Sequence, residues 1–233
     1  FSIIIAVREG VEVTPWYFNF NPYPGMGAEF ILQTTHLERL KTLFGDLSKR
    51  WFIHRALFDL SILRADGVEI AGEVWCTQAM ARLERNDHFR YNLSDCAERI
   101  GHSKDDRVEA YISEHGLSEK VPVPGKKQAV THKFFDRVPA DVMIPYGEQD
   151  ATVSFLLGEH QERAILEVAV GTPKTLPSLS TLAENERRLT KTVHRMEHVG
   201  LKIDRPYCVR AAQYEAARVL KSAEAFKRET GRD

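Results

Sequence analysis

The stretch Trp51-Phe-Ile-His-Arg-Ala-Leu-Phe-Asp-Leu60 joins a short apolar strand to a helix that begins at about Ala56. We expect this helix to end at Asp66-Gly67, because glycine is a common helix stop. The same order of strand and then helix recurs between Val74 and Leu83. Alternation of short strands with helices is typical of α/β proteins, so the sequence predicts an α/β fold.

Two β-rich runs, 1–7 and 11–20, lie on the amino side of this stretch, separated by Arg8-Glu9-Gly10. A short turn signal between two such runs predicts adjacent antiparallel strands. The segment Thr35-His-Leu-Glu38 has the form of a capping box, and it predicts a helix that ends at Gly45. We expect an open sheet to begin with these two strands.

On the carboxyl side, the sequence predicts an exposed loop over 121–127 and a long helix from near Pro145 to about Val168. The Gly/Pro-rich stretch 171–177 is the best candidate for a domain boundary. Beyond it we expect one helix from Thr181 to Gly200 and a second from about Pro206.

Composition excludes several classes of protein. The 233 residues carry a formal net charge of -1, and no apolar run approaches the roughly 20 residues of a membrane helix. We therefore expect a soluble protein with no membrane partner. Three widely spaced cysteines, Cys76, Cys96 and Cys208, form neither a zinc pattern nor a disulfide framework, which favours a reducing compartment such as the cytoplasm.

The first candidate site is Tyr146-Gly-Glu-Gln-Asp150. The spacing of four residues places Tyr146 and Asp150 on one face of a helix. A phenol one turn from a carboxylate can hold a water molecule beside a metal ion that the carboxylate binds. The same short pattern also fits a packed tyrosine and a solvated aspartate.

The second candidate is Asp59, which follows a strand and lies in the first turn of a helix. Acids in this position are common metal ligands in open α/β sheets, but a carboxylate there also complements the helix dipole. His54, beside an apolar strand, fits a hydrogen-bonded structural residue better than a metal ligand.

Four segments in one order resemble a known family: 54–59, 77–83, 91–101 and 145–151. They are similar to the DEDD-type 3′–5′ exonucleases of the tyrosine subclass, and most similar to the proofreading domain of bacterial and phage family A DNA polymerases. The segment 186–204 is similar to the one that opens the polymerase domain in those enzymes.

The resemblance implies an RNase H-like mixed β-sheet flanked by helices over residues 1–171, and the first helices of a polymerase domain over 172–233. It implies proofreading hydrolysis of a single-stranded 3′ end of DNA, in the cytoplasm of a bacterium or a phage-infected host, beside a polymerase domain in the same chain. Two divalent cations, Mg²⁺ or Mn²⁺, are implied as cofactors. The site residues that it implies are the metal ligands Asp59 and Asp150, Tyr146 to orient the attacking water, and His54, Arg55 and Phe58 against the nucleic acid.

The family's first motif, an Asp-x-Glu, is expected just before Phe1, so we predict that this chain by itself hydrolyses DNA poorly. Arg55 stands where the family usually has Asn, and Cys76 stands where an Asp is frequent. A non-catalytic nucleic-acid-binding module with a decayed site is therefore one alternative. A stand-alone exonuclease that trims RNA 3′ ends is another, and the polymerase-like segment argues against it.

Overall fold

The computed structural model describes residues 2–20, 24, 31–32, 34–123, 129–168 and 178–231. Contacts divide the chain into two compact units, 1–194 and 195–233. The division falls within a helix, whereas the boundary predicted at 171–177 lies outside the described residues, as does Phe1.

The predicted amino-terminal hairpin is confirmed. Strands β1 (Ser2–Glu9) and β2 (Glu12–Asn19) pair antiparallel, from Ser2 opposite Asn19 to Glu9 opposite Glu12. Gly10 takes a positive φ of 66° in the connecting turn, a conformation that costs glycine little. Pro15 lies within β2, and since proline cannot donate a ladder hydrogen bond, it marks β2 as an edge strand.

The strand–helix repeat is also confirmed. Strand β3 (Arg50–Ile53) leads into α2 (Ala56–Ala65), and β4 (Glu73–Cys76) leads directly into α3 (Thr77–Glu84). The two strands pair in parallel, so both helices begin at the same edge of the sheet. The protein is thus of mixed α/β class, as expected.

The expectation of one open sheet is not met within the described residues, where the strands form three two-stranded sheets. No ladder joins β1 to β3 there, although both sheets contribute to one apolar core around Ile3, Val74 and Leu60. The third sheet, β5 (Ser118–Val121) with β6 (Val130–Lys133), was not predicted. Its side chains are almost all exposed, so they lack the apolar alternation by which a strand is recognised.

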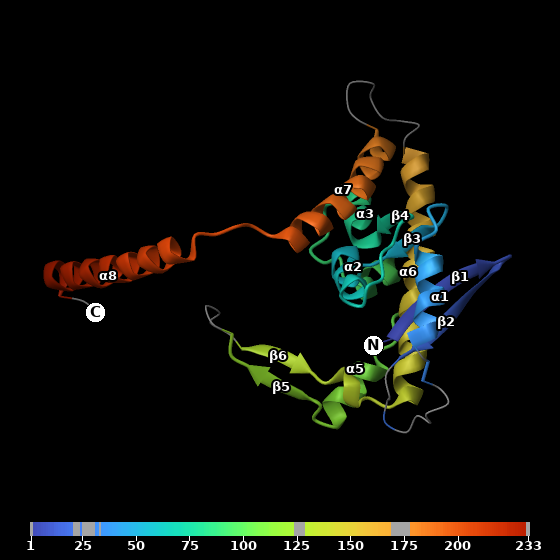
Figure 1. Ribbon diagram of the computed structural model, residues 1–233, viewed down its shortest axis with the longest axis horizontal. Coiled ribbons are helices and arrows are strands. Elements are labelled where there is room, and N and C mark those ends of the chain that lie inside the picture. Colours follow the sequence, from blue (N-terminus) through green and yellow to red (C-terminus); the bar gives the residue numbers. More distant parts are fainter. Residues whose placement is uncertain are drawn as a thin grey trace. The chain divides into compact units, whose positions relative to one another are not determined.

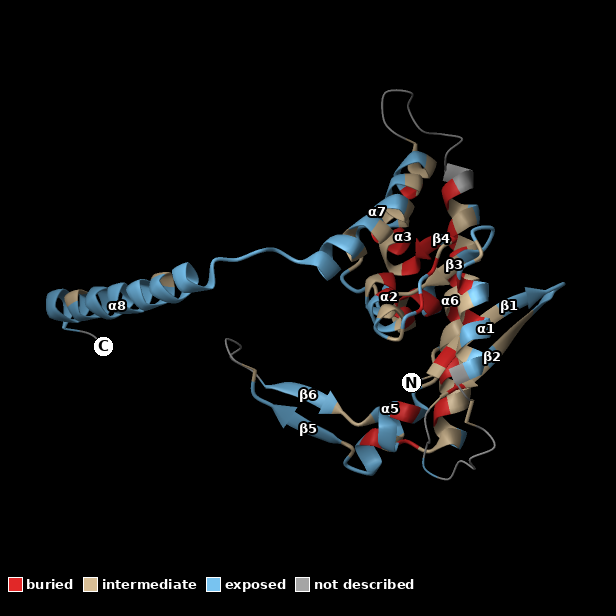
Figure 2. Ribbon diagram, in the orientation of Figure 1, coloured by how far each residue is buried: buried red, intermediate tan, exposed pale blue. Residues whose placement is uncertain are grey.

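The first unit has further helical segments up to residue 168. They are α1 (Thr34–Phe44), α4 (Leu93–Arg99), α5 (Arg107–Glu114), the short 3₁₀ turn η2 (Phe135–Arg137) and α6 (Ala140–Val168). Helix α6 contacts β1, β2 and β3 as well as α3, α4 and α5. Figure 1 shows it as the long helix that runs past both the hairpin and the parallel pair, and Figure 2 shows buried residues along it.

The predicted start of α6 is wrong by about one and a half turns. The helix begins at Ala140, so Pro145 lies inside it rather than in its first turn. Proline in the second turn leaves one carbonyl without its usual amide partner, a cost that the packing of α6 on both sheets offsets.

Two glycines let α6 approach the strands closely. A Cβ atom on Gly147 would lie 3.0 Å from the Tyr17 ring of β2, and one on Gly158 would lie only 2.1 Å from the Phe52 ring of β3. Both sheets therefore pack against backbone rather than side chain at these positions.

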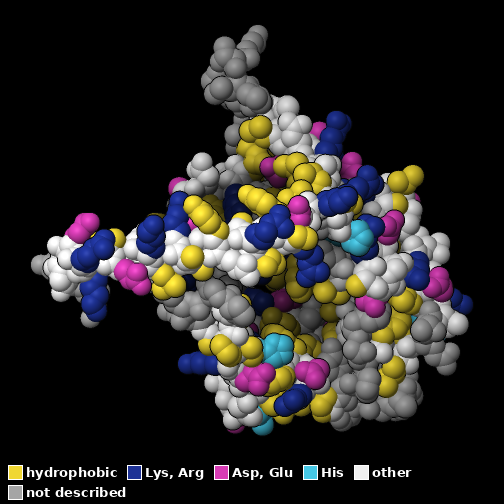
Figure 3. Space-filling model, turned by 60° about the vertical axis from the view of Figure 1, so that its left-hand side comes forward, with side chains coloured by type: hydrophobic (Ala, Val, Ile, Leu, Met, Phe, Trp, Pro, Cys, Tyr) yellow, Lys and Arg dark blue, Asp and Glu magenta, His cyan; other side chains and the backbone are white. Residues whose placement is uncertain are grey.

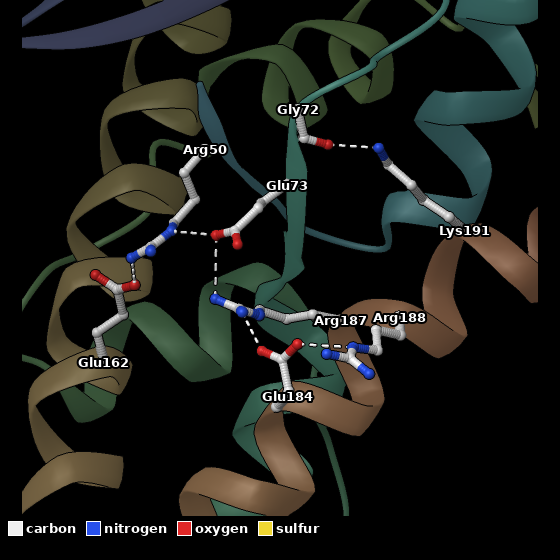
Figure 4. Close-up of polar contacts among 8 residues, drawn as sticks. All are labelled: Arg50, Gly72, Glu73, Glu162, Glu184, Arg187, Arg188 and Lys191. Atoms are coloured by element: carbon white, nitrogen blue, oxygen red, sulfur yellow. Dashed lines mark hydrogen bonds and ion pairs between the residues drawn. The ribbon is translucent and has the colours of Figure 1, made fainter. Parts of the chain in front are cut away.

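The amino-terminal three quarters of helix α7 (Leu179–Val199) belong to the first unit. Ala183 is buried in a cluster with Trp75 and Met80. Next to this cluster, Arg187 pairs with Glu73 of β4 at 3.1 Å, and Glu73 also accepts from Arg50 at 2.9 Å (Figure 4). The start of α7 is capped by Ser178, whose hydroxyl accepts from the Thr181 amide, so the helix begins two residues before the predicted start at Thr181.

The second unit consists of the end of α7 and helix α8 (Arg205–Thr230). Asp204 caps α8 by accepting from the Tyr207 amide at 3.0 Å, and Gly231 ends it with a positive φ of 68°. No described side chain of α8 is buried. Apolar side chains lie among Lys and Arg at the surface in Figure 3. No helix of the described residues has the length and apolarity needed to cross a membrane.

Candidate functional site

Three of the four segments that carry the resemblance meet at His54. Its Nδ1 lies 3.0 Å from the Thr77 hydroxyl, and its Nε2 lies 3.1 Å from the Tyr91 carbonyl oxygen. Because a carbonyl only accepts, Nε2 must carry the proton, and Nδ1 then accepts from Thr77. Burial, opposed by the Tyr91 hydrogen bond and helped by the nearby charges of Lys104 and Arg55, lowers the pKa of His54 to about 4. His54 is thus a neutral residue that joins three segments.

Thr77 is held in turn by a buried glutamine of α6. Gln161, which is fully buried, accepts from the Trp75 indole at 3.1 Å and donates to the Thr77 carbonyl at 2.8 Å. Both ends of its amide are therefore satisfied inside the core. These bonds fix the end of β4 against α6, and with it the position of His54.

Arg55 occupies the junction between β3 and α2 in a left-handed conformation, with φ 58° and ψ 48°. It is the one non-glycine residue of positive φ in the part of the chain that the structure describes. Strained backbone of this kind is concentrated at functional sites. The left-handed conformation of Arg55 turns the chain sharply. Helix α2 therefore starts at the next residue, and Asp59 lies in its first turn.

Asp59 is largely withdrawn from water. Burial raises its pKa to about 6, and the positive charge of Arg55 opposes this shift. Phe58, the residue before it, is 62% exposed. The same short helix turn therefore presents a carboxyl group in a poorly solvated place beside an aromatic ring that is open to solvent.

Tyr146 and Asp150 lie one turn apart on α6, and a lysine joins them. The Lys104 ammonium donates to the Tyr146 hydroxyl at 3.0 Å and lies 3.1 Å from Asp150 Oδ2. Asp150 Oδ1 is buried and has no hydrogen-bond partner. Burial raises the pKa of Asp150 in spite of the opposing charge of Lys104 and the hydrogen bonds from Lys104 and Tyr146.

The described residues provide only part of a binding site for a divalent cation. An unpartnered, buried carboxylate oxygen such as Asp150 Oδ1 is the kind of atom that a hard cation binds. However, the described part of the chain holds no group of three or more His, Cys, Asp and Glu side chains arranged for a metal ion. Asp59 and Asp150 are not in contact within it, and the charge that acts on Asp59 is that of Arg55.

The structure thus brings together Tyr146 and Asp150, and it brings His54 to Thr77 and Tyr91. Lys104 links the two groups, because its charge acts on His54 as well as on Asp150. Sequence reasoning missed Lys104 and Gln161. Lys104 lies in an irregular segment where no periodicity marks it, whereas a glutamine within an apolar helix face could have indicated the buried contact of Gln161.

No profile of a known protein family matches the chain, and no curated protein matches it significantly.

Proposed function

We propose that this chain is the 3′–5′ proofreading exonuclease region of a family A DNA polymerase, with an RNase H-like fold and the first helices of the polymerase domain after it. The observation that carries the proposal is the pair Tyr146 and Asp150, side by side on α6, with one Asp150 oxygen buried and unpartnered. The sequence resemblance gives these two residues the water-orienting and metal-binding roles.

The arrangement of the strands is compatible with this fold. Strands β1 and β3 each have only one strand partner among the described residues, yet they border one apolar core. Since Pro15 makes β2 an edge strand, an additional strand between the two sheets would pair along β1 and β3. The resemblance assigns the Asp-x-Glu motif to such a strand.

In the proposed reaction, Asp59 and Asp150 would hold Mg²⁺ or Mn²⁺ together with the carboxylates of the Asp-x-Glu motif that the resemblance implies. Two such cations would stabilise the charge on the attacking and departing oxygens. The Tyr146 hydroxyl orients the attacking water. Phe58 stacks against a base of the single-stranded 3′ end, and Arg55 contacts its phosphates. His54 holds the end of strand β3 in position through its hydrogen bonds with Thr77 and Tyr91.

The experiment uses the natural reading frame that includes the Asp-x-Glu strand, and it measures release of nucleoside monophosphate from a mismatched DNA primer with Mg²⁺. Asp150→Ala should abolish release. Asp141→Ala, in the exposed first turn of the same helix, is the matched control and should leave it unchanged. Equal release by wild type and Asp150→Ala would overturn the proposal.

A second candidate function is binding of nucleic acid without catalysis. It is favoured by the Lys104 ammonium, which neutralises Asp150 where a cation would have to bind. This alternative predicts that the protein with the Asp-x-Glu strand included binds single-stranded DNA but releases no nucleotide. An RNA primer in a parallel reaction distinguishes the third possibility, a nuclease that trims RNA.

A further inference from the structure

Lys104 is held in place from both sides by one glutamine of α6. Gln149 donates through Nε2 to the Ser103 carbonyl at 3.1 Å, and its Oε1 accepts from the Asp105 amide. The backbone on either side of Lys104 is thus tied to the helix that carries Tyr146 and Asp150. The two hydrogen bonds of Gln149 thus hold Lys104 next to Tyr146 and Asp150.

The ammonium group lies in a confined place. It contacts the Tyr146 hydroxyl and Asp150 Oδ2, and it lies 4.8 Å from the centre of the Tyr146 ring. The side chains of Lys104 and Asp150 are only 22% and 27% exposed. Water therefore screens this ion pair less than it screens a surface pair.

The two oxygens of Asp150 are in different states. Oδ2 faces the ammonium, whereas Oδ1 is buried and unpartnered. A divalent cation binds a carboxylate oxygen at about 2.0–2.6 Å, and Asp150 Oδ2 lies 3.1 Å from the Lys104 nitrogen, so a cation on Oδ2 would lie within roughly 6 Å of that nitrogen. Like charges this close repel strongly in a poorly solvated site.

We propose that Lys104 is a built-in competitor of the divalent cation: its ammonium occupies Asp150 in the free chain and must move away before a metal ion binds there tightly. Lys104 then sets the metal concentration at which the site fills. This inference rests on the proposed function only in taking Asp150 as a metal ligand.

The test measures Mn²⁺ binding to the chain without DNA, from the electron paramagnetic resonance signal of free Mn²⁺. Lys104→Met should bind Mn²⁺ at least tenfold more tightly than wild type, because the competing charge is gone. Lys104→Arg keeps the charge and should bind as weakly as wild type. Adding Asp150→Asn to Lys104→Met should remove the gain.

Lys133→Met is the matched control, since Lys133 pairs with Glu109 in the same unit and should not affect Mn²⁺ binding. Circular dichroism establishes that each variant is folded. If Lys104→Met is unfolded, Lys104→Gln serves in its place, because its amide still donates to Tyr146. Binding by the folded neutral variant that is no tighter than in wild type would overturn the inference.

The two proposals fail in different ways. If Lys104→Met binds Mn²⁺ more tightly but the protein with the Asp-x-Glu strand releases no nucleotide, the exonuclease function is overturned and the competitor role of Lys104 is supported. Nucleotide release that depends on Asp150, with no change in Mn²⁺ affinity in Lys104→Met, supports the exonuclease and overturns the competitor role.

Discussion

His54 Nε2 lies 3.1 Å from the carbonyl oxygen of Tyr91, a residue 37 positions further along the chain. This bond joins the end of β3 to the segment that precedes α4. Gln78 donates to the same carbonyl at 2.9 Å, so three segments that are separate in sequence share one acceptor. The position of the candidate site depends on this junction.

The first prediction concerns the charge of His54. With a pKa of about 4, it should remain neutral down to about pH 5, whereas in the unfolded chain it gains a proton near pH 6.5. Stability should therefore be lost as the pH falls from 6.5 toward 4, by up to about 3 kcal/mol. The His54 Hε1 resonance, followed by NMR against pH, should show this low midpoint, and Lys104→Met should raise it. A midpoint near 6.5 in the wild type would contradict the prediction.

The second prediction concerns Asp59. Since burial raises its pKa to about 6, the folded state binds this proton more tightly than the unfolded state does. Ionised Asp59 therefore lowers the free energy of unfolding. This loss is absent below about pH 4 and complete above pH 6, where it reaches up to about 3 kcal/mol. Asp59→Asn should therefore be more stable than wild type in urea at pH 8 and equal to it at pH 3.5. Glu69→Gln, an exposed carboxylate, is the control and should show no such difference.

The third prediction tests the buried glutamine. Gln161→Met should leave the Trp75 indole N–H without a partner inside the core and should remove the side-chain hydrogen bond to the Thr77 carbonyl. An unsatisfied buried group costs about 1–3 kcal/mol and a lost hydrogen bond about 0.5–1.5 kcal/mol, so the variant should lose roughly 1.5–4.5 kcal/mol of unfolding free energy. Urea denaturation measures the loss. Gln213→Met on the exposed face of α8 should change stability by less than about 0.5 kcal/mol.

The fourth prediction tests the contact between α6 and β3. Gly158→Ala would place a methyl group 2.1 Å from the Phe52 ring and should cost about 1–3 kcal/mol. Adding Phe52→Leu should recover part of that loss, because the smaller side chain leaves room for the methyl group. The four proteins form a double-mutant cycle in thermal unfolding, and additive effects would show that the two residues do not touch.

The fifth prediction concerns the attachment of α7. Arg187 contacts both Glu73 and Glu184 and its side chain is only 18% exposed, whereas the neighbouring Arg188 pairs with Glu184 alone and is 78% exposed. Arg187→Met should speed hydrogen exchange of the α7 amides, and Arg188→Met should not, because exposed ion pairs contribute little. Equal exchange in both variants would mean that the ion pairs of Arg187 do not hold α7 in place.

Local features of the sequence were sufficient to predict most elements. The hairpin follows from two β-rich runs around Gly10, and the junction of β3 with α2 follows from apolar residues that end at His54. The exposed hairpin of β5 and β6 could not be found, because its pattern has no buried face. Lys104 could not be found either, since its importance comes from contacts with Tyr146 and Asp150, more than forty residues away.

The close contact of β1 and β2 with α6 also determines when this hairpin can be covered by its partner helix during synthesis of the chain. A Cβ on Gly147 would touch the side chains of Tyr17 and Ile4, so this surface of the hairpin is completed only by a helix that is made about 130 residues later. At about 5–20 residues per second, a ribosome needs roughly 6–26 s to make that interval. Throughout that time the apolar side of a nascent β-hairpin is open to chaperones, or to another chain.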